Sequence, residues 1–286
     1  MEEKNNSIVY TEIPMRTWRW LGVNEGKISA DLLAHLPMRG RIYVKPGMTD
    51  SQVHVCRKSD REICQVAVGA NANCTVTNIV LAPDDAEWAG ALKIRVDAGG
   101  HVQANIIHLG GKNVLCSVEI ELVGDDSSAE LNALYFAAYE EKYDMNFIIR
   151  QMGKRTDAKM NVYGALGGNA DKIFRGTLDF VQGCSGSVGN EKEEIILLSD
   201  GVRNRTVPLM LSGEDDVDGH HAASIGRMDE EKLFYLMSRG LDEEEAKRLV
   251  LEATFAPVVN MIENEALKAE VEEAINRKVA KCLGNT

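Results

Sequence analysis

Long hydrophobic runs are missing from this chain of 286 residues. No stretch approaches the roughly 20 apolar residues that span a bilayer, and the longest candidate, Leu131 to Ala138, is far too short. The N-terminal string MEEKNNS has neither the basic nor the apolar region of a secretory signal. We therefore expect a cytoplasmic protein that makes no use of a membrane.

Cysteines and aromatic residues are also few. None of the six cysteines forms a C-x-x-C pair, which argues against a zinc ribbon or a thioredoxin-like site. Disulfides are not expected in a reducing cytosol, so most of these residues are interpreted as small buried hydrophobes. Aromatic residues make up only 6% of the chain, which argues against the aromatic groove of a polysaccharide-acting β-helix enzyme.

Positive charge is in deficit, and the net charge is −12. Phosphate backbones and anionic lipid surfaces need clustered Lys and Arg, so the composition excludes nucleic acid and an anionic membrane surface as partners. The segment Gly22 to Lys27 resembles a phosphate loop, but it is one residue too short between its glycines. We therefore expect no nucleotide hydrolysis by the chain itself.

Short β-rich runs separated by turn residues fill the chain from about residue 60 to about residue 210. Many alternate apolar with polar side chains, as in the series Val114, Cys116, Val118, Ile120 and Leu122. This alternation is the pattern of a half-buried strand. The pattern favours an all-β core, and it leaves a sandwich, a barrel and a β-helix open.

Helical periodicity replaces this pattern after Gly226. An amphipathic helix follows Asp229, a second begins at Asp242 with Glu245 as its capping partner, and Pro257 is expected to interrupt it. A third helix carries apolar residues at four-residue spacing from Leu267 to Leu283. We predict three parts: an N-terminal cap region (1–55), a β core (56–212) and a helical subdomain (213–286).

Candidate ligands gather in a Gly-bounded loop ahead of the first helix. Carboxylates at Glu214 and Asp216 precede His221, and such side chains hold hard cations, iron or zinc. Read on spacing alone, the same residues also fit a solvated turn. Cys184 lies in a Gly/Ser-rich turn, where an accessible thiol would serve as a metal ligand or sulfur acceptor; the alternative is a packed small residue.

The chain resembles the SufB/SufD family of iron–sulfur cluster assembly proteins. The segment Glu214 to Val250 follows the family's order of a DDV string, a His-containing turn, a Gly and acidic residues before Phe-Tyr-Leu-x-Ser-Arg-Gly. Gly176 to Phe180 and Glu193 to Leu211 resemble the family's last β coils. The chain is similar to compact, SufD-like or minimal-system core subunits.

This resemblance implies a mainly β fold, with a right-handed parallel β-helix core and a C-terminal α-helical subdomain. It implies that the helices dock an ABC-type ATPase, SufC, and we expect the contact at Phe234, Tyr235 and Arg239. The chain would form a dimer with itself or with a sister SufB/SufD-type subunit. The expected cofactor is an iron–sulfur cluster held transiently, with none resident in the isolated chain. Because ATP is hydrolysed by the partner, the chain is expected to be a scaffold and not an enzyme.

One departure from the family pattern divides the functional hypotheses. SufB-like scaffolds carry a Cys two residues before the His of the turn, whereas this chain has Gly219 there and keeps His221, as SufD-like members do. The first hypothesis is a cluster scaffold in which His221 acts with Cys184, Asp216 or Glu214 as ligands. The second is a structural partner that binds no metal and couples the ATPase to another scaffold subunit.

Overall fold

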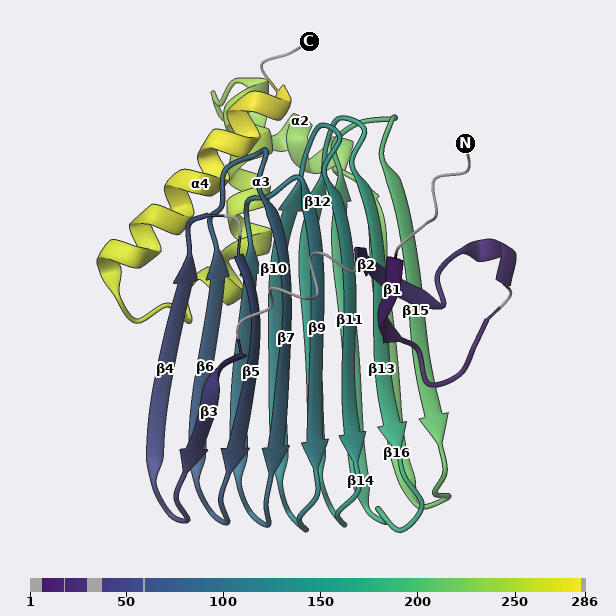
Figure 1. The fold of residues 1–286 in the computed structure, drawn as a ribbon. Coiled ribbons are helices and arrows are strands. Elements are labelled where there is room, and N and C mark those ends of the chain that lie inside the picture. Colours follow the sequence, from purple (N-terminus) through teal and green to yellow (C-terminus); the bar gives the residue numbers. More distant parts are fainter. Residues whose placement is uncertain (1–6, 18, 30–37, 59, 284–286) are drawn as a thin grey trace.

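Two parallel β-sheets wound into one solenoid dominate the computed structural model, which describes residues 7–17, 19–29, 38–58 and 60–283 (Figure 1). Each turn contributes one strand to each sheet, and each sheet has seven strands. The odd sheet contains β3 (Met38–Val44), β5 (Asp60–Val68), β7 (Glu87–Val96), β9 (Asn113–Leu122), β11 (Lys142–Gln151), β13 (Asp171–Phe180) and β15 (Arg203–Ser212). The even sheet contains β4 (Thr49–Cys56), β6 (Asn73–Val80), β8 (His101–His108), β10 (Ser128–Ala137), β12 (Asp157–Leu166), β14 (Ser187–Leu197) and β16 (Val217–Arg227). The prediction of a parallel β-helix core with C-terminal helices is confirmed.

The register between turns explains why no sequence repeat stands out. Lys142 pairs with Asn113 on one side and with Asp171 on the other, in unbroken parallel ladders. Residues that bond across neighbouring turns, such as Arg150 and Asp179, lie 29 positions apart, but other such pairs lie 27 or 32 apart. The turn length varies in the connecting loops, so the repeat is structural and is blurred in the sequence.

The hydrophobic core fills the lumen, meaning the space between the two sheets. The alternating series predicted from Val114 to Leu122 points into it, and all five of its apolar residues are buried. Phe147 and Phe174 from adjacent turns pack edge to face, with ring centroids 5.4 Å apart. In each strand every second side chain points into the lumen. This is why runs that alternate apolar and polar residues dominate this part of the sequence.

Three helices follow the solenoid: α2 (Glu230–Ser238), α3 (Glu243–Val259) and α4 (Glu265–Leu283). Helices α3 and α4 cover the outer face of the even sheet, where Phe136 of β10 meets Phe255 of α3 in a second apolar cluster. The predicted capping box of Asp242 and Glu245 is confirmed. The expected interruption at Pro257 is wrong, because α3 continues through it to Val259. The missing N–H costs one hydrogen bond, and the burial of Phe255 and Val258 on either side of Pro257 offsets that cost.

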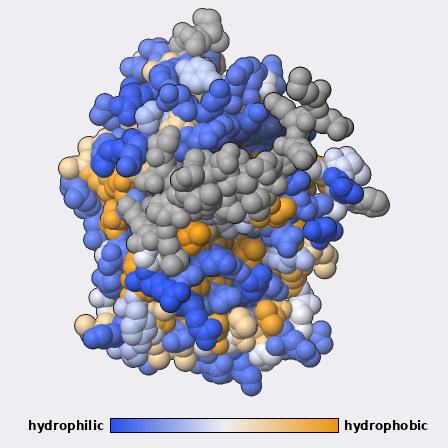
Figure 2. All heavy atoms as spheres, viewed as in Figure 1, coloured by the Kyte–Doolittle hydropathy of each residue, from blue (hydrophilic) through white to orange (hydrophobic). Residues whose placement is uncertain are grey.

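An N-terminal hairpin lies on the opposite side, over the outer face of the odd sheet (Figure 1). It pairs β1 (Ser7–Glu12) with β2 (Glu25–Ser29) and carries the short 3-10 helix η1 (Arg19–Leu21) between them. Figure 2 shows this side of the molecule with many hydrophilic residues and smaller hydrophobic patches between them. The odd sheet also carries the ion pairs of Arg150 with Glu119 and Asp179. Of the region expected to cap the core, residues 1–6, 18 and 30–37 lie outside the described residues. Among the helices that are described, none is both long and apolar enough to cross a membrane.

Candidate functional site

The predicted ligand loop is largely a strand, so that expectation was wrong. Val217–Arg227 forms β16, which pairs residue by residue with β14. Only the first residues of the predicted loop form the turn between β15 and β16. Because β16 is the last strand of its sheet, nearly all of its residues are exposed, and its sequence carries no alternating apolar pattern. A strand with one neighbour and no fully buried side lacks the signal by which strands are recognised.

The strand parity of β16 separates its two histidines. His221 pairs with Glu191 of β14, and its Nδ1 atom lies 3.5 Å from Glu191 Oε2. The His221 side chain is 30% exposed, whereas that of Glu191 is 1% exposed. His220 lies on the other side of the strand, where its Nε2 is 3.1 Å from Asp218 in solvent. The structure therefore presents His221, and not His220, at the end of the lumen.

Glu191 is held in a site made for its carboxyl group. A Cβ atom at Gly176 of β13 would collide with Glu191 Oε1, so only glycine leaves room for it there. This Oε1 atom is buried and has no hydrogen-bond partner among the described residues. Burial, together with the nearby charge of Glu193, raises the pKa of Glu191 to about 8. A buried carboxyl oxygen without a donor is costly, which makes it a candidate for binding a cation or a proton.

A second buried carboxylate lies two residues further along β14. Glu193 forms an ion pair of 2.6 Å with Lys172, and both side chains are inaccessible to solvent. Lys172 Nζ also donates to Asn204 Oδ1 at 3.0 Å and to Thr206 Oγ1 at 2.8 Å. Burial lowers the pKa of Lys172 to about 8, although Glu193 opposes the shift. This network satisfies Lys172 and joins the last two turns of the lumen beside Glu191, but the second oxygen of Glu193, Oε2, is buried without a hydrogen-bond partner among the described residues.

The other predicted ligands lie at the start of β16, away from His221. Glu214 Oε2 accepts from the backbone N–H of Gly183 at 3.0 Å, and Asp216 Oδ2 accepts from Ser185 Oγ at 2.6 Å. These bonds tie the β15–β16 turn to the preceding turn of the solenoid, and the backbone donors lower the pKa of Glu214. His221 lies five positions after Asp216, which corresponds to about 16 Å along an extended strand.

Cys184 lies in that preceding turn and is fully buried, so its expected accessibility was wrong. Burial also raises the pKa of its thiol, which keeps it protonated and unreactive. The thiol packs in the lumen core near its end and does not face solvent. This matches the alternative interpretation, in which Cys184 is a packed small residue. Among the described residues, no group of three or more His, Cys, Asp or Glu side chains is arranged to hold a metal ion.

The last turn of the solenoid has free edges. Within the described part of the chain, no strand pairs with the outer edge of β15 or β16. Met210 and Ile225, which pair with lumen-facing positions of the previous turn, are exposed large hydrophobics at this end. At Gly219, where the SufB-like pattern has a Cys, a Cβ atom would collide with Met210 Sδ. The methionine therefore occupies the space that a side chain there would need.

Helix α2 is the least buried element of the C-terminal part. Asp229 caps it by accepting from the N–H groups of Glu231 and Lys232, but none of its residues is buried. Phe234 is 74% exposed and Tyr235 is 56% exposed. Arg239 stacks over the Tyr235 ring, 5.2 Å from its centroid. Exposed aromatic side chains beside an Arg are typical of protein interfaces, which makes this surface a candidate contact site.

Glu191, Glu193 and Lys172 were not predicted from the sequence. A signal for the first two was present, because both share the strand parity of buried Ile195 in the run EKEEII. Two carboxylates on the lumen-facing side of a strand contradict the rule that charges stay outside, and such contradictions point to function. Nothing in the sequence indicates that Lys172 reaches the same place, because it lies on β13, in the other sheet, 21 positions before Glu193.

Comparisons with known proteins agree with this architecture. A family model described as "SUF system FeS cluster assembly, SufBD core domain" matches residues 34–254. The iron–sulfur cluster assembly protein SufD of Bacillus subtilis is 34% identical over 158 residues, which cover 55% of this chain and 36% of the relative. A SufBD family iron–sulfur cluster assembly protein of Mycobacterium leprae is 29% identical over 222 residues, which cover 74% of this chain and 56% of the relative. The matched region thus spans between about a third and somewhat over half of these relatives.

Proposed function

The chain belongs to the SufBD family of iron–sulfur cluster assembly proteins, and from this premise we propose that it is a core subunit of a SUF-type assembly complex. In that complex it works with an ABC-type ATPase, SufC, to build or transfer a nascent cluster. The observation that carries the proposal is the pairing of His221 with buried Glu191 at the open end of the lumen.

Iron or a nascent cluster, as cargo, would bind between these two side chains. Imidazole nitrogen and carboxylate oxygen both suit iron, and Glu191 has an oxygen without a hydrogen-bond donor. Binding would displace the proton that burial favours on Glu191. Glu214, Asp216 and Cys184 stay predicted ligands that would need the β15–β16 turn to rearrange, because their present bonds hold them elsewhere.

A dimer would complete the ligand set. The two ligands on this chain are too few for iron, and the free edges of β15 and β16 lie beside them. A second copy or a sister subunit that pairs with these edges would cover Met210 and Ile225 and bring its own ligands to His221. The cluster would then form between subunits and be shielded from solvent.

The ATPase would dock on helix α2 through Phe234, Tyr235 and Arg239. Aromatic and Arg side chains dominate binding energy at protein interfaces, and here they are exposed in the free chain. Only one residue, Met228, and the N-cap Asp229 separate β16 from α2. Movement of the docked helix on ATP binding would therefore be transmitted directly to the strand that bears His221.

A second function is supported by a specific observation. Three of the four ligands predicted from the sequence are engaged or buried away from His221, and among the described residues no group of three or more metal-ligating side chains is found. The chain would then be a structural partner that couples the ATPase to another scaffold subunit without binding metal.

Anaerobic reconstitution of the chain with its ATPase, followed by iron and acid-labile sulfide determination, separates the two functions. The scaffold function predicts iron and sulfide in near-equal amounts in the wild type, with strong loss in His221→Ala and in Glu191→Gln. His220→Ala is the matched control, because the neighbouring imidazole faces solvent on the other side of β16. An intact complex that retains no iron would contradict the scaffold function and support the structural function.

Docking is tested on the same complex. Phe234→Asp should abolish co-purification of the ATPase while leaving the folded chain intact, because this side chain contributes little to the core. Leu249→Asp, at another exposed apolar position on α3, controls for the general effect of a new charge. Retention of the ATPase by Phe234→Asp would rule out this surface.

A further inference from the structure

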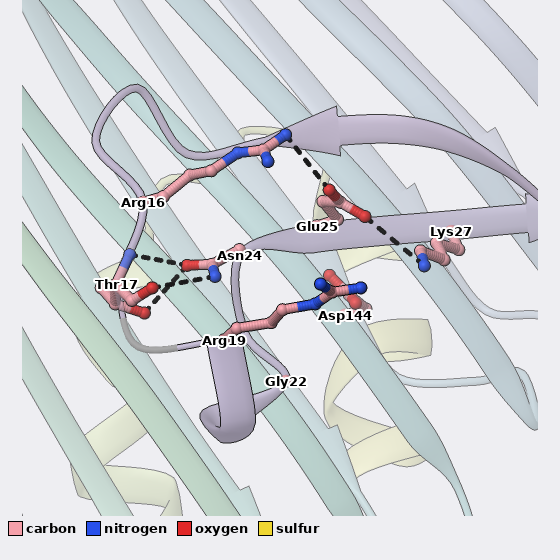
Figure 3. A pocket seen from close by; sticks show the side chains of 8 residues that line it. All are labelled: Arg16, Thr17, Arg19, Gly22, Asn24, Glu25, Lys27 and Asp144. Atoms are coloured by element: carbon pink, nitrogen blue, oxygen red, sulfur yellow. Dashed lines mark hydrogen bonds and ion pairs between the residues drawn. The ribbon is translucent and has the colours of Figure 1, made fainter.

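A pocket of about 690 Å³ lies between the N-terminal hairpin and the outer face of the odd sheet (Figure 3). It is bounded by the N-terminal arm, which we define as residues 13–17 and 19–24, and by β2 and Asp144 of β11. Its volume falls within the range of about 300 to 1,000 Å³ that is usual for small-molecule sites. No part of the proposed assembly function uses this pocket, because it is on the outer face of the other sheet from His221.

The arm is held in one shape by a buried arginine. Arg175 of β13, which is fully buried, donates to the backbone carbonyls of Val23 and Glu25 and forms an ion pair with Asp144. A fully buried guanidinium is stable only when its donors are satisfied. Two of the satisfying groups are the backbone carbonyls of Val23 and Glu25, so departure of the arm would leave donors of the buried guanidinium without acceptors.

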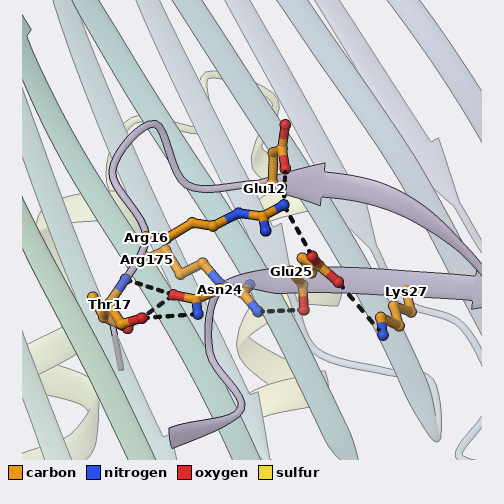
Figure 4. Close-up of polar contacts among 7 residues, drawn as sticks. All are labelled: Glu12, Arg16, Thr17, Asn24, Glu25, Lys27 and Arg175. Carbon is orange, nitrogen blue, oxygen red and sulfur yellow. Dashed lines mark hydrogen bonds and ion pairs between the residues drawn. The ribbon is translucent and has the colours of Figure 1, made fainter. Parts of the chain in front are cut away.

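Asn24 closes the arm on itself from the other side (Figure 4). Its Oδ1 atom accepts from the backbone N–H of Thr17 at 2.7 Å and from Thr17 Oγ1 at 2.9 Å. Its Nδ2 atom donates to the Thr17 carbonyl at 3.1 Å. Three hydrogen bonds between two residues seven positions apart make the arm a closed ring, and the pocket is therefore preorganised.

The charges that line the pocket do not balance. Three lining side chains are cationic (Arg16, Arg19 and Lys27), and two are anionic (Glu25 and Asp144). Glu25 is shared by Arg16 and Lys27 at 3.3 and 3.4 Å, and Asp144 is taken by Arg175. Arg19 is left over: its guanidinium makes no hydrogen bond or ion pair with any described residue, and Figure 3 shows it extended across the pocket.

We propose that this pocket binds the oxyanion group of a small soluble molecule, a phosphate or a carboxylate, with Arg19 as its principal contact. The planar guanidinium presents paired N–H donors that match such groups. Arg16, which also pairs with Glu12 at 3.3 Å, and Lys27 are more than half exposed. Exposed ion pairs contribute little, so both side chains can turn to the ligand at little cost. On a chain of net charge −12, a local excess of positive charge favours anion binding here.

Isothermal titration calorimetry of the full chain with inorganic phosphate, pyrophosphate and citrate, each in phosphate-free buffer, tests the proposal. We expect saturable binding of one stoichiometric equivalent, with pyrophosphate tighter than phosphate because it offers a second group to Arg16 and Lys27. Tighter binding of citrate than of pyrophosphate would identify carboxylate as the source of the oxyanion. Arg19→Gln should weaken binding about tenfold, since it removes a charge-assisted contact.

Arg95→Gln is the matched control. Arg95 is exposed on the outer face of the same sheet, on β7, and its substitution removes the same charge outside the pocket. The proposal is overturned if none of the three anions binds saturably, or if Arg95→Gln weakens binding as much as Arg19→Gln does. The reconstituted complex should retain as much iron with Arg19→Gln as with the wild type. The anion-binding proposal is therefore tested independently of the assembly function.

Discussion

The ion pair of Lys278 with Glu141 fastens the C-terminal helices to the solenoid, and its removal should destabilise the protein strongly. Lys278 Nζ of α4 donates to Glu141 Oε2 at 2.6 Å and to the carbonyl of Phe136 at 2.7 Å. The two side chains are only 6% and 4% exposed. Glu141 also accepts from the backbone N–H of Ala138 at 2.9 Å, in the loop that follows β10.

Lys278→Met keeps the length of the side chain but leaves Glu141 buried without its cation. Breaking a buried pair in this way costs about 3 to 5 kcal/mol of unfolding free energy. Burial already raises the pKa of Glu141, and the loss of Lys278 raises it further. At low pH the variant's carboxyl group takes up a proton and its charge disappears, so the destabilisation should be smaller at pH 5 than at pH 8.

Urea unfolding followed by circular dichroism measures both effects. The control is Lys281→Met, three residues further along α4, because Lys281 pairs with Asp84 at 2.7 Å while both side chains are about half exposed. Such a surface pair contributes about 0 to 1 kcal/mol. The double variant Lys278→Met with Glu141→Gln should recover part of the loss. Destabilisation of less than about 1 kcal/mol by Lys278→Met, or an effect equal to that of Lys281→Met, would refute the reasoning.

Three further predictions concern the solenoid itself. The pKa of Glu191 is raised to about 8, so the folded state binds this proton more tightly than the unfolded state does. The free energy of unfolding should therefore fall as the pH rises from about 4.5 to 8. Glu191→Gln should flatten this part of the pH profile, measured by urea unfolding. Gly176→Ala should lower the unfolding free energy by about 1 to 3 kcal/mol, because the added Cβ collides with Glu191 Oε1. Gly226→Ala is the control and should show no such loss, since nothing lies within 4 Å of its added Cβ. Cys184 should resist an aromatic disulfide reagent in the native protein and react on unfolding, as followed by mass spectrometry of labelled peptides; rapid native labelling would contradict its burial.

The strands could be predicted from the sequence because side-chain alternation is a local property. In β9 the series Val114, Cys116, Val118, Ile120 and Leu122 occupies every second position and points into the lumen, while Leu115 is buried on the outer face. Alternation says that one side of a strand is buried, but not against what, so a sandwich, a barrel and a β-helix all fitted the residues alone. The resemblance of Glu214 to Val250 to the SufB/SufD family was needed to choose the β-helix.

The candidate site was predicted only in part, because its members come from different turns. His221 was found from its motif, and Phe234 and Tyr235 from the motif that follows. Glu191 was missed, since its proximity to His221 depends on the register of β14 against β16, which places residues 30 positions apart side by side. Local sequence carries no information about that register, because it is set by the lengths of the intervening turns.

The sequence by itself determined the strand and helix periodicity, the capping of α3 and the family to which the chain belongs. Only the tertiary structure decided which charges are buried and which are free. Cys184 is buried although it lies in a turn, because that turn closes the lumen. Arg175 is buried although it lies on an outer face, because the N-terminal arm covers it, whereas Arg19 of that arm has no partner in the described part of the chain. Burial and pairing depend on what lies across space from a residue, and that is fixed only when all the turns are stacked.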